Sequence, residues 1–350
     1  MKKLIVVEPH KAALVEYEDR AVNSDEVKIK VTFASPKHGT EIADFNGTTP
    51  FIDGKYDPEW QVFSKRAENE PRGIVYGDLP IGNMVVGEII EKGSNVADFT
   101  MGDRVVTYGA IRETVIINGV QNHRLRKLPE NMSPKLSVLY DPAQFALGGI
   151  RDAKVCAGDF VSVIGLGAIG QIAVQLAKKA GASIVIAVDP IAKRREVAIQ
   201  NGADIALDPL GCDVGYEIKK LTNKIGCDQI LETSGNMQAL QSSLKGLAYG
   251  GTIAYLAFPK TFPAGLWLGQ EAHFNYGHII FSRAASEPNP DYPRWNRKRI
   301  EETCWSLLKN NYIDATNIID PIVPFMESAD AFSYYVDIHP EKSIKMGVQF

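Results

Sequence analysis

This chain has few cysteines and no long hydrophobic run. Its four cysteines, Cys156, Cys212, Cys227 and Cys304, are scattered and form no C-x-x-C pair. Scattered thiols suit a reducing cytosol and argue against a structural zinc lobe. No apolar run reaches the ~20 residues of a membrane-spanning helix. The start, M-K-K-L-I-V-V-E-P, is too short in its apolar part for a signal peptide. We therefore expect a cytoplasmic protein without a membrane partner.

The chain also lacks an excess of positive charge. Its 38 Lys and Arg residues face 42 Asp and Glu residues, for a net charge of -4. This balance gives no reason to expect nucleic acid or an anionic membrane as a partner. The 45% hydrophobic and 23% charged content is ordinary for a globular protein, and 350 residues suggest two domains, each with its own core.

Residues 159–189 predict a strand, a glycine-rich turn, a helix and a second strand. Phe160–Ile164 is a short apolar run, typical of a buried parallel strand. A G-x-G-x-x-G sequence follows, then a helical pattern that Gly181 stops, then the apolar run Ile184–Val188. This order is the pattern of a dinucleotide-binding unit. A glycine-rich turn that binds nothing is the alternative.

Each glycine of this loop has a physical role. Gly165 allows the tight turn, Gly167 lets a pyrophosphate approach the backbone, and Gly170 lets helix and strand pack closely. The helix N-terminus offers free N–H groups and the positive end of its dipole to the phosphates. The predicted phosphate loop therefore comprises Gly165, Leu166, Gly167, Ala168, Ile169 and Gly170.

Asp189 indicates which dinucleotide binds. It ends the second strand, where a carboxylate can accept hydrogen bonds from the adenosine ribose. A 2′-phosphate would face this negative charge, so NAD is favoured. Lys193, Arg194 and Arg195 follow closely and could accommodate that phosphate, so NADP stays the less favoured alternative. We include Arg194 among the predicted cofactor residues.

The rest of the chain divides into two patterns. Residues 1 to about 140 contain many short strand candidates broken by Gly, Asp and Asn, which suggests a compact barrel or sandwich. Beyond residue 159 strands and helices alternate, which implies a parallel sheet covered on both faces. Pro50–Pro80 is polar, aromatic and turn-rich, and it reads as a long surface excursion that could meet a hydroxylated substrate. Lys342–Phe350 is predicted to be a final strand that returns to the first domain.

The chain resembles the medium-chain dehydrogenase/reductase superfamily, specifically its alcohol and polyol dehydrogenase branch. The similarity lies in G-E-I-I-E-K-G-S at 87–94, Phe99, G-D-R-V at 102–105, K-L-P at 127–129 and the glycine loop. It implies hydride transfer between a nicotinamide and an alcohol or ketone, hence a small hydroxylated or carbonyl substrate. A homodimer or homotetramer is also implied.

The resemblance implies an α/β architecture of two domains. A Rossmann domain with a doubly wound parallel sheet is expected over residues 146–294. A β-rich, GroES-like catalytic domain is expected over residues 1–145, completed by residues 295–350. By the same resemblance, Thr233 and Ser234 lie where the family wraps the adenine end of the cofactor, and three further residues lie on the nicotinamide side: Ala257, Phe258 and Phe281.

The sequence departs from the family at the zinc-ligand positions. Zinc members carry C-G-S/T-D, then G-H-E, then a cysteine or an E-P pair. Here these motifs read His38-Gly39-Thr40-Glu41, Gly82-Asn83-Met84 and Asp141-Pro142. Imidazole and carboxylate are zinc ligands, whereas asparagine and methionine are poor ones. We therefore assign no metal residues; a zinc held by His38 and Asp141, with Glu41, is an alternative that we do not favour.

Three residues at these positions are predicted to handle the proton. Thr40 occupies the place from which the zinc branch passes the alcohol proton toward solvent, and His38 has an unperturbed pKa of about 6.5, suited to acid–base work near neutral pH. Asp141 could orient His38 or accept a hydrogen bond from a substrate hydroxyl. The alternative is that all three are remnants held by ordinary hydrogen bonds.

The leading hypothesis is thus an NAD-dependent oxidoreductase that acts on a secondary alcohol, such as a sugar, polyol or cyclitol. Two alternatives remain. One is a zinc-free, NADPH-dependent reductase of the quinone or enoyl type, which would usually lack an acid at the Asp189 position. The other is a dinucleotide-binding protein without turnover.

Overall fold

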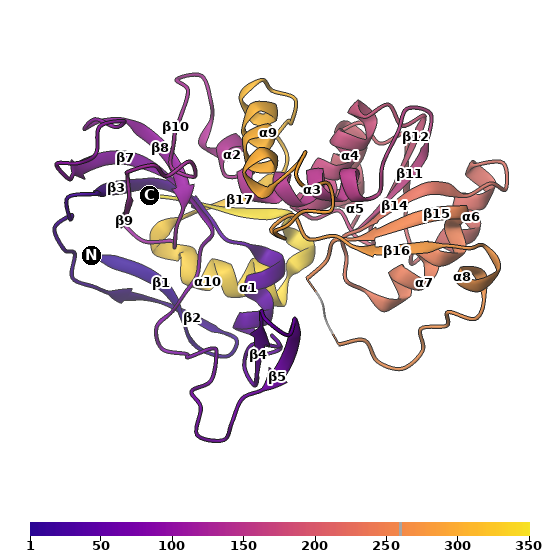
Figure 1. The fold of residues 1–350 in the computed structure, drawn as a ribbon, viewed down its shortest axis with the longest axis horizontal. Coiled ribbons are helices and arrows are strands. Elements are labelled where there is room, and N and C mark those ends of the chain that lie inside the picture. Colours follow the sequence, from indigo (N-terminus) through magenta and orange to yellow (C-terminus); the bar gives the residue numbers. More distant parts are fainter. Residues whose placement is uncertain (259–260) are drawn as a thin grey trace. The chain divides into compact units, whose positions relative to one another are not determined.

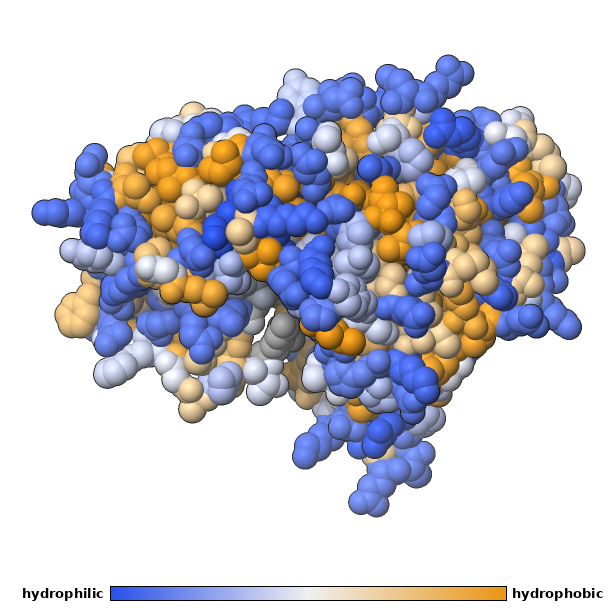
Figure 2. All heavy atoms as spheres, turned by 180° about the vertical axis from the view of Figure 1, so that it is seen from behind, coloured by the Kyte–Doolittle hydropathy of each residue, from blue (hydrophilic) through white to orange (hydrophobic). Residues whose placement is uncertain are grey.

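A computed structural model describes residues 1–258 and 261–350 of the chain (Figure 1). The chain divides into two compact units, and each is described by itself. Unit 1 comprises Met1–Val138 and Ile319–Phe350, and unit 2 comprises Leu139–Ile318. Among the helices in the described ranges, none combines the length and the apolar character needed to cross a membrane. On the face shown in Figure 2, hydrophilic residues are widespread and hydrophobic residues lie in several separate groups.

Unit 1 is built mainly from short β-strands. Its larger sheet runs in the order β10-β8-β7-β3-β18-β17, with β9 also paired to β3, and its smaller sheet runs β2-β1-β6. The strand bounds are β1 (Lys2–Glu8), β2 (Lys11–Glu16), β3 (Glu26–Ser35), β6 (Leu79–Pro80), β7 (Met84–Lys92), β8 (Arg104–Tyr108), β9 (Thr114–Asn118), β10 (Arg126–Lys127), β17 (Ile319–Pro324) and β18 (Lys345–Gln349). The predicted β-rich character of this part of the chain is confirmed.

The C-terminal segment completes the larger sheet of unit 1. β18 pairs antiparallel with β3 through Val348 and Ala34, and parallel with β17. The predicted final strand therefore does return to the first part of the chain. Beside it lies a buried core in which the Phe45 and Phe332 rings meet edge to face at 5.2 Å.

The helices of unit 1 are short. They are α1 (His38–Phe45), α2 (Pro134–Ser137) and α10 (Ser328–Phe332), followed by a π-helical stretch over Ser333–Ile338, with single 3-10 turns at Phe325–Glu327 and Pro340–Lys342. α2 begins as its sequence suggests, because Ser133 accepts a hydrogen bond from Leu136 N–H and Pro134 takes the first helical position. α2 ends after Ser137, and Val138 is its C-cap.

A β-hairpin interrupts the predicted surface excursion. β4 (Gly54–Asp57) and β5 (Val62–Lys65) pair with each other and with no other strand of the described residues. The surface excursion expected over Pro50–Pro80 thus contains a regular element, in which Tyr56 lies opposite Phe63. Alternation was hidden because both strands are largely exposed.

Unit 2 contains a six-stranded parallel sheet in the order β13-β12-β11-β14-β15-β16. The strands are β11 (Phe160–Ile164), β12 (Ile184–Val188), β13 (Ile205–Leu207), β14 (Cys227–Glu232), β15 (Leu247–Tyr255) and β16 (His278–Phe281). This order is that of the doubly wound Rossmann fold, with the reversal between β11 and β14. The predicted fold class is confirmed.

Helices lie on both faces of this sheet, with α4 and α7 on opposite sides (Figure 1). The helices of unit 2 are α3 (Tyr140–Asp152), α4 (Ala168–Lys179), α5 (Ala192–Gln200), α6 (Val214–Leu221), α7 (Met237–Gly246), α8 (Glu271–Phe274) and α9 (Arg297–Lys309). α9 packs on α3, so residues 139–145 and 295–318, which the sequence analysis grouped with the GroES-like part, lie in this unit.

Candidate functional site

The predicted cofactor residues meet at one edge of the parallel sheet. Five strands end in a single row of register partners: Val188, Ile164, Glu232, Tyr255 and Phe281. Gly165, Asp189 and Thr233 each follow a member of this row directly. Since parallel strands present their carboxyl ends at the same edge, the chain assembles a ligand edge at the reversal of strand order.

The glycine loop has the close approaches that its spacing predicts. Gly165 adopts a φ of +88°, and a Cβ there would lie 2.7 Å from the backbone nitrogen of Ser234. A Cβ on Gly170 would lie 1.9 Å from the carbonyl oxygen of Gly165, so α4 can pack on β11 only at a glycine. A Cβ on Gly167, by contrast, would meet nothing within 4 Å. Gly167 therefore leaves an open cradle next to the backbone.

The N-terminus of α4 presents donors beside this cradle. Gly167 is the N-cap and supplies no side-chain acceptor, and the first intrahelical hydrogen bond runs from Gln171 N–H to Gly167 O. Three preceding N–H groups are left at the helix end, those of Ala168, Ile169 and Gly170. Together with the positive end of the helix dipole they fit a pyrophosphate.

Asp189 is held in place by the loop it faces. It is 3% exposed, and its carboxylate oxygens accept hydrogen bonds from Leu166 N–H at 2.8 Å and Ile191 N–H at 2.9 Å. A carboxylate has about four acceptor positions, so about two remain for the hydroxyls of a ribose. Asp189 therefore fits an unphosphorylated ribose at the position that the sequence predicts.

The basic residues after Asp189 are already engaged. Arg194 lies 3.8 Å from the Asp189 carboxylate. Arg195 donates to the backbone oxygen of Asp189 at 2.7 Å and pairs with Asp208 at 3.0 Å. These ion pairs weaken the case that either guanidinium serves a 2′-phosphate.

A buried glutamate that the sequence analysis missed organises the Thr233–Gly235 loop. Glu232 is fully buried and accepts hydrogen bonds from the Ser234 N–H at 2.8 Å, the Ser234 hydroxyl and the Gly235 N–H at 3.2 Å. Thr233 Oγ1 donates to Gly165 O at 2.6 Å, which ties this loop to the glycine loop. Burial raises the pKa of Glu232. The only available signal was an acid at the end of an apolar strand.

The three residues predicted for the nicotinamide side lie at or just beyond the ends of β15 and β16. Ala257 and Phe258 are partly buried, and Phe281 is 81% exposed. A Cβ on Gly235 would lie 3.1 Å from the Ala257 Cβ, so this segment also packs beside the Thr233–Gly235 loop. Their place at the nicotinamide stays a prediction.

The predicted proton-handling residues are distributed over both units. His38 and Thr40 lie in the first turn of α1 in unit 1, and both are partly buried. Asp141 is buried in the first turn of α3 in unit 2. His38 Nε2 accepts a hydrogen bond from Met346 N–H at 3.0 Å, which requires the neutral ring with its proton on Nδ1. The grouping of all three into one site stays a prediction.

Glu41 connects two of the segments that differ from the zinc motifs. Its carboxylate accepts hydrogen bonds from Lys37 N–H at 2.8 Å and Gly82 N–H at 2.9 Å. Burial raises the pKa of Glu41 to about 7, although these two hydrogen bonds and the charges of Lys345 and Lys37 act in the opposite direction. Glu41 thus holds the start of α1 to the turn before β7.

The side chains of unit 1 do not fit a zinc shell. The Nε2 lone pair of His38 and both oxygens of Glu41 face backbone donors, and Asn83 Nδ2 is a buried donor without a hydrogen-bond partner in residues 1–258 and 261–350. No group of three His, Cys, Asp or Glu side chains in those residues is arranged to bind a metal. We therefore derive no catalytic step through zinc.

Comparison with known proteins identifies close relatives of the chain. The family model described as zinc-binding dehydrogenase matches residues 168–285. The chain is 61% identical to D-guloside 3-dehydrogenase of Escherichia coli over 350 residues, which covers 100% of both chains.

Solved structures share the fold. The chain superposes on 2R,3R-butanediol dehydrogenase from Bacillus subtilis with a TM-score of 0.78 at 21% identity, covering 100% of this chain and 99% of that one. Galactitol-1-phosphate dehydrogenase from Escherichia coli gives a TM-score of 0.77 at 18% identity, with 100% of both chains covered.

Substitutions at the second and third glycines of the loop should separate cofactor binding from folding. Gly167→Ala is expected to leave the free energy of unfolding near the wild-type value, because its Cβ meets no protein atom, and to weaken NADH binding at least about tenfold. Gly170→Ala should destabilise the protein by about 1–3 kcal/mol through overpacking. Urea unfolding and NADH fluorescence titration measure both. Unchanged NADH affinity in Gly167→Ala would contradict the cradle.

Glu41→Gln should make stability depend less on pH between about 4.5 and 7. Because burial raises the pKa of the carboxyl from 4.5 to about 7, the folded state prefers the protonated acid, and the unfolding free energy falls as pH rises through this window. The effect is about 3 kcal/mol at most. Urea unfolding near pH 5 and near pH 8, with exposed Glu130→Gln as control, measures it. A difference between variant and wild type that stays constant with pH would contradict this account.

Proposed function

The chain belongs to the medium-chain dehydrogenase/reductase superfamily and is an alcohol- or polyol-dehydrogenase-like oxidoreductase, and from this premise we propose that it oxidises a secondary hydroxyl of a sugar glycoside with NAD. The observation that carries the proposal lies at the carboxyl edge of the parallel sheet. There the open cradle at Gly167 and the carboxylate of Asp189 follow the ends of neighbouring strands. When bound, the nicotinamide accepts a hydride from the carbon that bears the hydroxyl. The protein binds and orients the cofactor and moves the hydroxyl proton.

NAD is proposed over NADP on the charge and geometry at the ribose. Asp189 is buried and ordered by two backbone donors, so a 2′-phosphate would meet a fixed negative charge. Arg195 pairs with Asp208 and donates to the backbone oxygen of Asp189, so its guanidinium is already engaged and is not available to a 2′-phosphate.

A sugar glycoside is proposed as the substrate because the relative at 61% identity, aligned over the full length of both chains, is named D-guloside 3-dehydrogenase. The name of that relative suggests a D-guloside as the first compound to test. The choice agrees with the sugar, polyol or cyclitol substrate expected from the sequence.

The proton is proposed to pass from the substrate hydroxyl through Thr40 to His38. His38 is neutral in the structure because its Nε2 accepts the Met346 N–H, and the first turn of α1 places Thr40 two residues away. In the proposed step Nε2 releases this donor and takes the proton. Asp141 would stabilise the imidazolium or bind a neighbouring hydroxyl. Assembly as a homodimer or homotetramer, implied by the family resemblance, and the cytoplasmic location expected from the sequence also belong to this proposal.

The function is tested by following NADH formation from a methyl D-guloside, with NADP⁺ measured in parallel. We expect kcat/KM to be higher with NAD⁺ than with NADP⁺. Asp189→Asn should lower the ratio of these two values at least about tenfold, because it removes the negative charge that faces the 2′-phosphate. Asp98→Asn is the control, since it removes the same charge from an exposed residue of unit 1 that the cofactor site does not use. A wild-type preference for NADP⁺ with activity on conjugated carbonyls would favour a quinone- or enoyl-type reductase instead.

His38→Gln should lower kcat by about 10²–10⁴-fold, the contribution typical of a general base. Glutamine retains an oxygen that can accept the Met346 N–H, so the fold of the α1 start is expected to persist. NADH affinity should stay within about threefold of wild type. His339→Gln, at a partly exposed histidine paired with Glu341, is the matched control. Full turnover in His38→Gln would show that His38 is not the base.

A further inference from the structure

The segment over residues 50–73, here called the hairpin excursion, projects from the end of α1. It follows two backbone hydrogen bonds to Ala43 O, from Thr48 at 2.8 Å and Thr49 at 3.2 Å, and after it Tyr76 donates to Asp44 O at 2.9 Å. The excursion is therefore anchored to the helix whose first turn carries His38 and Thr40. This helix has eight residues and is about 12 Å long.

One face of the hairpin excursion exposes an aromatic platform, defined as Phe51, Tyr56 and Phe63. The Phe63 ring lies 5.6 Å from that of Phe51 and 5.4 Å from that of Tyr56. Tyr56 and Phe63 are opposite each other in the hairpin register and hence share a face. The three side chains are 37%, 49% and 53% exposed. Neighbouring rings are tilted by 53° and 57° to each other, and at this accessibility their exposed faces offer apolar surface to a ligand.

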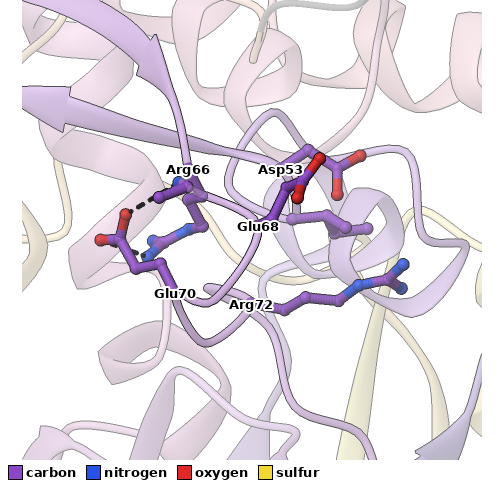
Figure 3. Close-up of a pocket in the computed structure, with 7 residues that line it drawn as sticks. Asp53, Arg66, Glu68, Glu70 and Arg72 are labelled. Atoms are coloured by element: carbon purple, nitrogen blue, oxygen red, sulfur yellow. Dashed lines mark hydrogen bonds and ion pairs between the residues drawn. The ribbon is translucent and has the colours of Figure 1, made fainter.

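A small charged pocket adjoins the platform along the chain. It has a volume of about 200 Å³ and is lined by Ile52, Asp53, Arg66, Ala67, Glu68, Glu70 and Arg72. Figure 3 shows Glu70 turned toward Arg66 on one side of the pocket and Asp53 with Glu68 on the other. Arg66 donates to Pro71 O at 3.2 Å, and Lys55 binds Glu70 at 2.9 Å.

The charges of this pocket indicate the class of ligand. An anion would face three carboxylates, and a cation would face two guanidinium groups. Arg66 Nε is buried and has no hydrogen-bond partner in the part of the chain that the structure describes, so an acceptor is wanted there. Donors and acceptors together fit a neutral compound with several hydroxyls, and aromatic rings beside them fit the apolar face of a sugar. The volume suits a single small group and not a drug-sized ligand, which needs about 300 Å³ or more.

We propose that the hairpin excursion is a subsite for a neutral sugar unit, namely the part of a glycoside that is not oxidised. This inference rests on the proposed function and deepens it: the ring that loses hydride lies at the reaction centre, and the unit joined to it rests on the aromatic platform with its hydroxyls toward the pocket.

The test uses the full chain and compares two substrates. One is a methyl D-guloside, and the other is a D-guloside that carries a neutral hexose in place of the methyl group. Tyr56→Ala and Arg72→Gln, both at exposed positions, should raise KM for the two-ring glycoside about tenfold. Both variants should leave kcat, and KM for the methyl glycoside, within about twofold of wild type. Tyr56→Phe keeps the ring and should behave as wild type. Tyr216→Ala, an equally exposed tyrosine on α6, is the control.

The outcomes separate the subsite from the function. Oxidation of both glycosides with no selective loss in Tyr56→Ala and Arg72→Gln would overturn the subsite and leave the proposed function standing. An equal rise of KM for both glycosides would also overturn it, because the methyl glycoside has no second unit that the subsite could bind. A lower KM for a glycoside with a carboxylated second unit than for one with a neutral second unit would contradict the proposal of a neutral ligand. Oxidation of neither glycoside would overturn the proposed function and the subsite with it.

Discussion

The close contact between α4 and β11 is the constraint on which the cofactor site depends. With no side chain at Gly170, the helix approaches until a Cβ would lie 1.9 Å from Gly165 O. This approach brings the open end of α4 to the carboxyl edge of the sheet, where the Asp189 carboxylate accepts the Leu166 N–H and Thr233 donates to Gly165 O. The ends of three strands are thereby connected around the glycine loop, and the N–H groups left at the helix end fit a phosphate.

The segments at the zinc-ligand positions of the sequence are held together by hydrogen bonds to backbone groups. Glu41 connects the residue before α1 with Gly82, and His38 accepts the Met346 N–H of β18. The imidazole of His38 and the carboxylate of Glu41, both of a chemistry that can bind a metal, thus serve here as acceptors. The Met346 hydrogen bond keeps the His38 ring neutral. Burial raises the pKa of Glu41 to about 7, although the hydrogen bonds that it accepts act in the opposite direction.

Much of unit 2 could be predicted from the sequence because local and long-range signals agree there. Phe160–Ile164 and Ile184–Val188 have in the structure the bounds that their apolar runs indicate. A strand buried on both faces is apolar throughout, and glycine or a polar residue ends it. The nucleotide loop was predictable for the same reason, since its glycine spacing is a steric requirement.

The remaining features depend on tertiary contacts. The exposed strands of the β4–β5 hairpin have no hydrophobic alternation, and α1 is short, so neither stood out. The role of Glu232 follows from its burial, and that of Glu41 from its contact with Gly82, 41 residues away in the chain. Sequence spacing could not reveal either one.

The central claim is that this protein carries out nicotinamide-dependent oxidation with a proton site that needs no zinc. The most direct test is the rate of NADH formation from a methyl D-guloside before and after treatment with a strong chelator, with zinc content measured in the same samples. The account predicts an unchanged rate and zinc far below one atom per chain. A rate that falls on chelation and returns when zinc is added would contradict it.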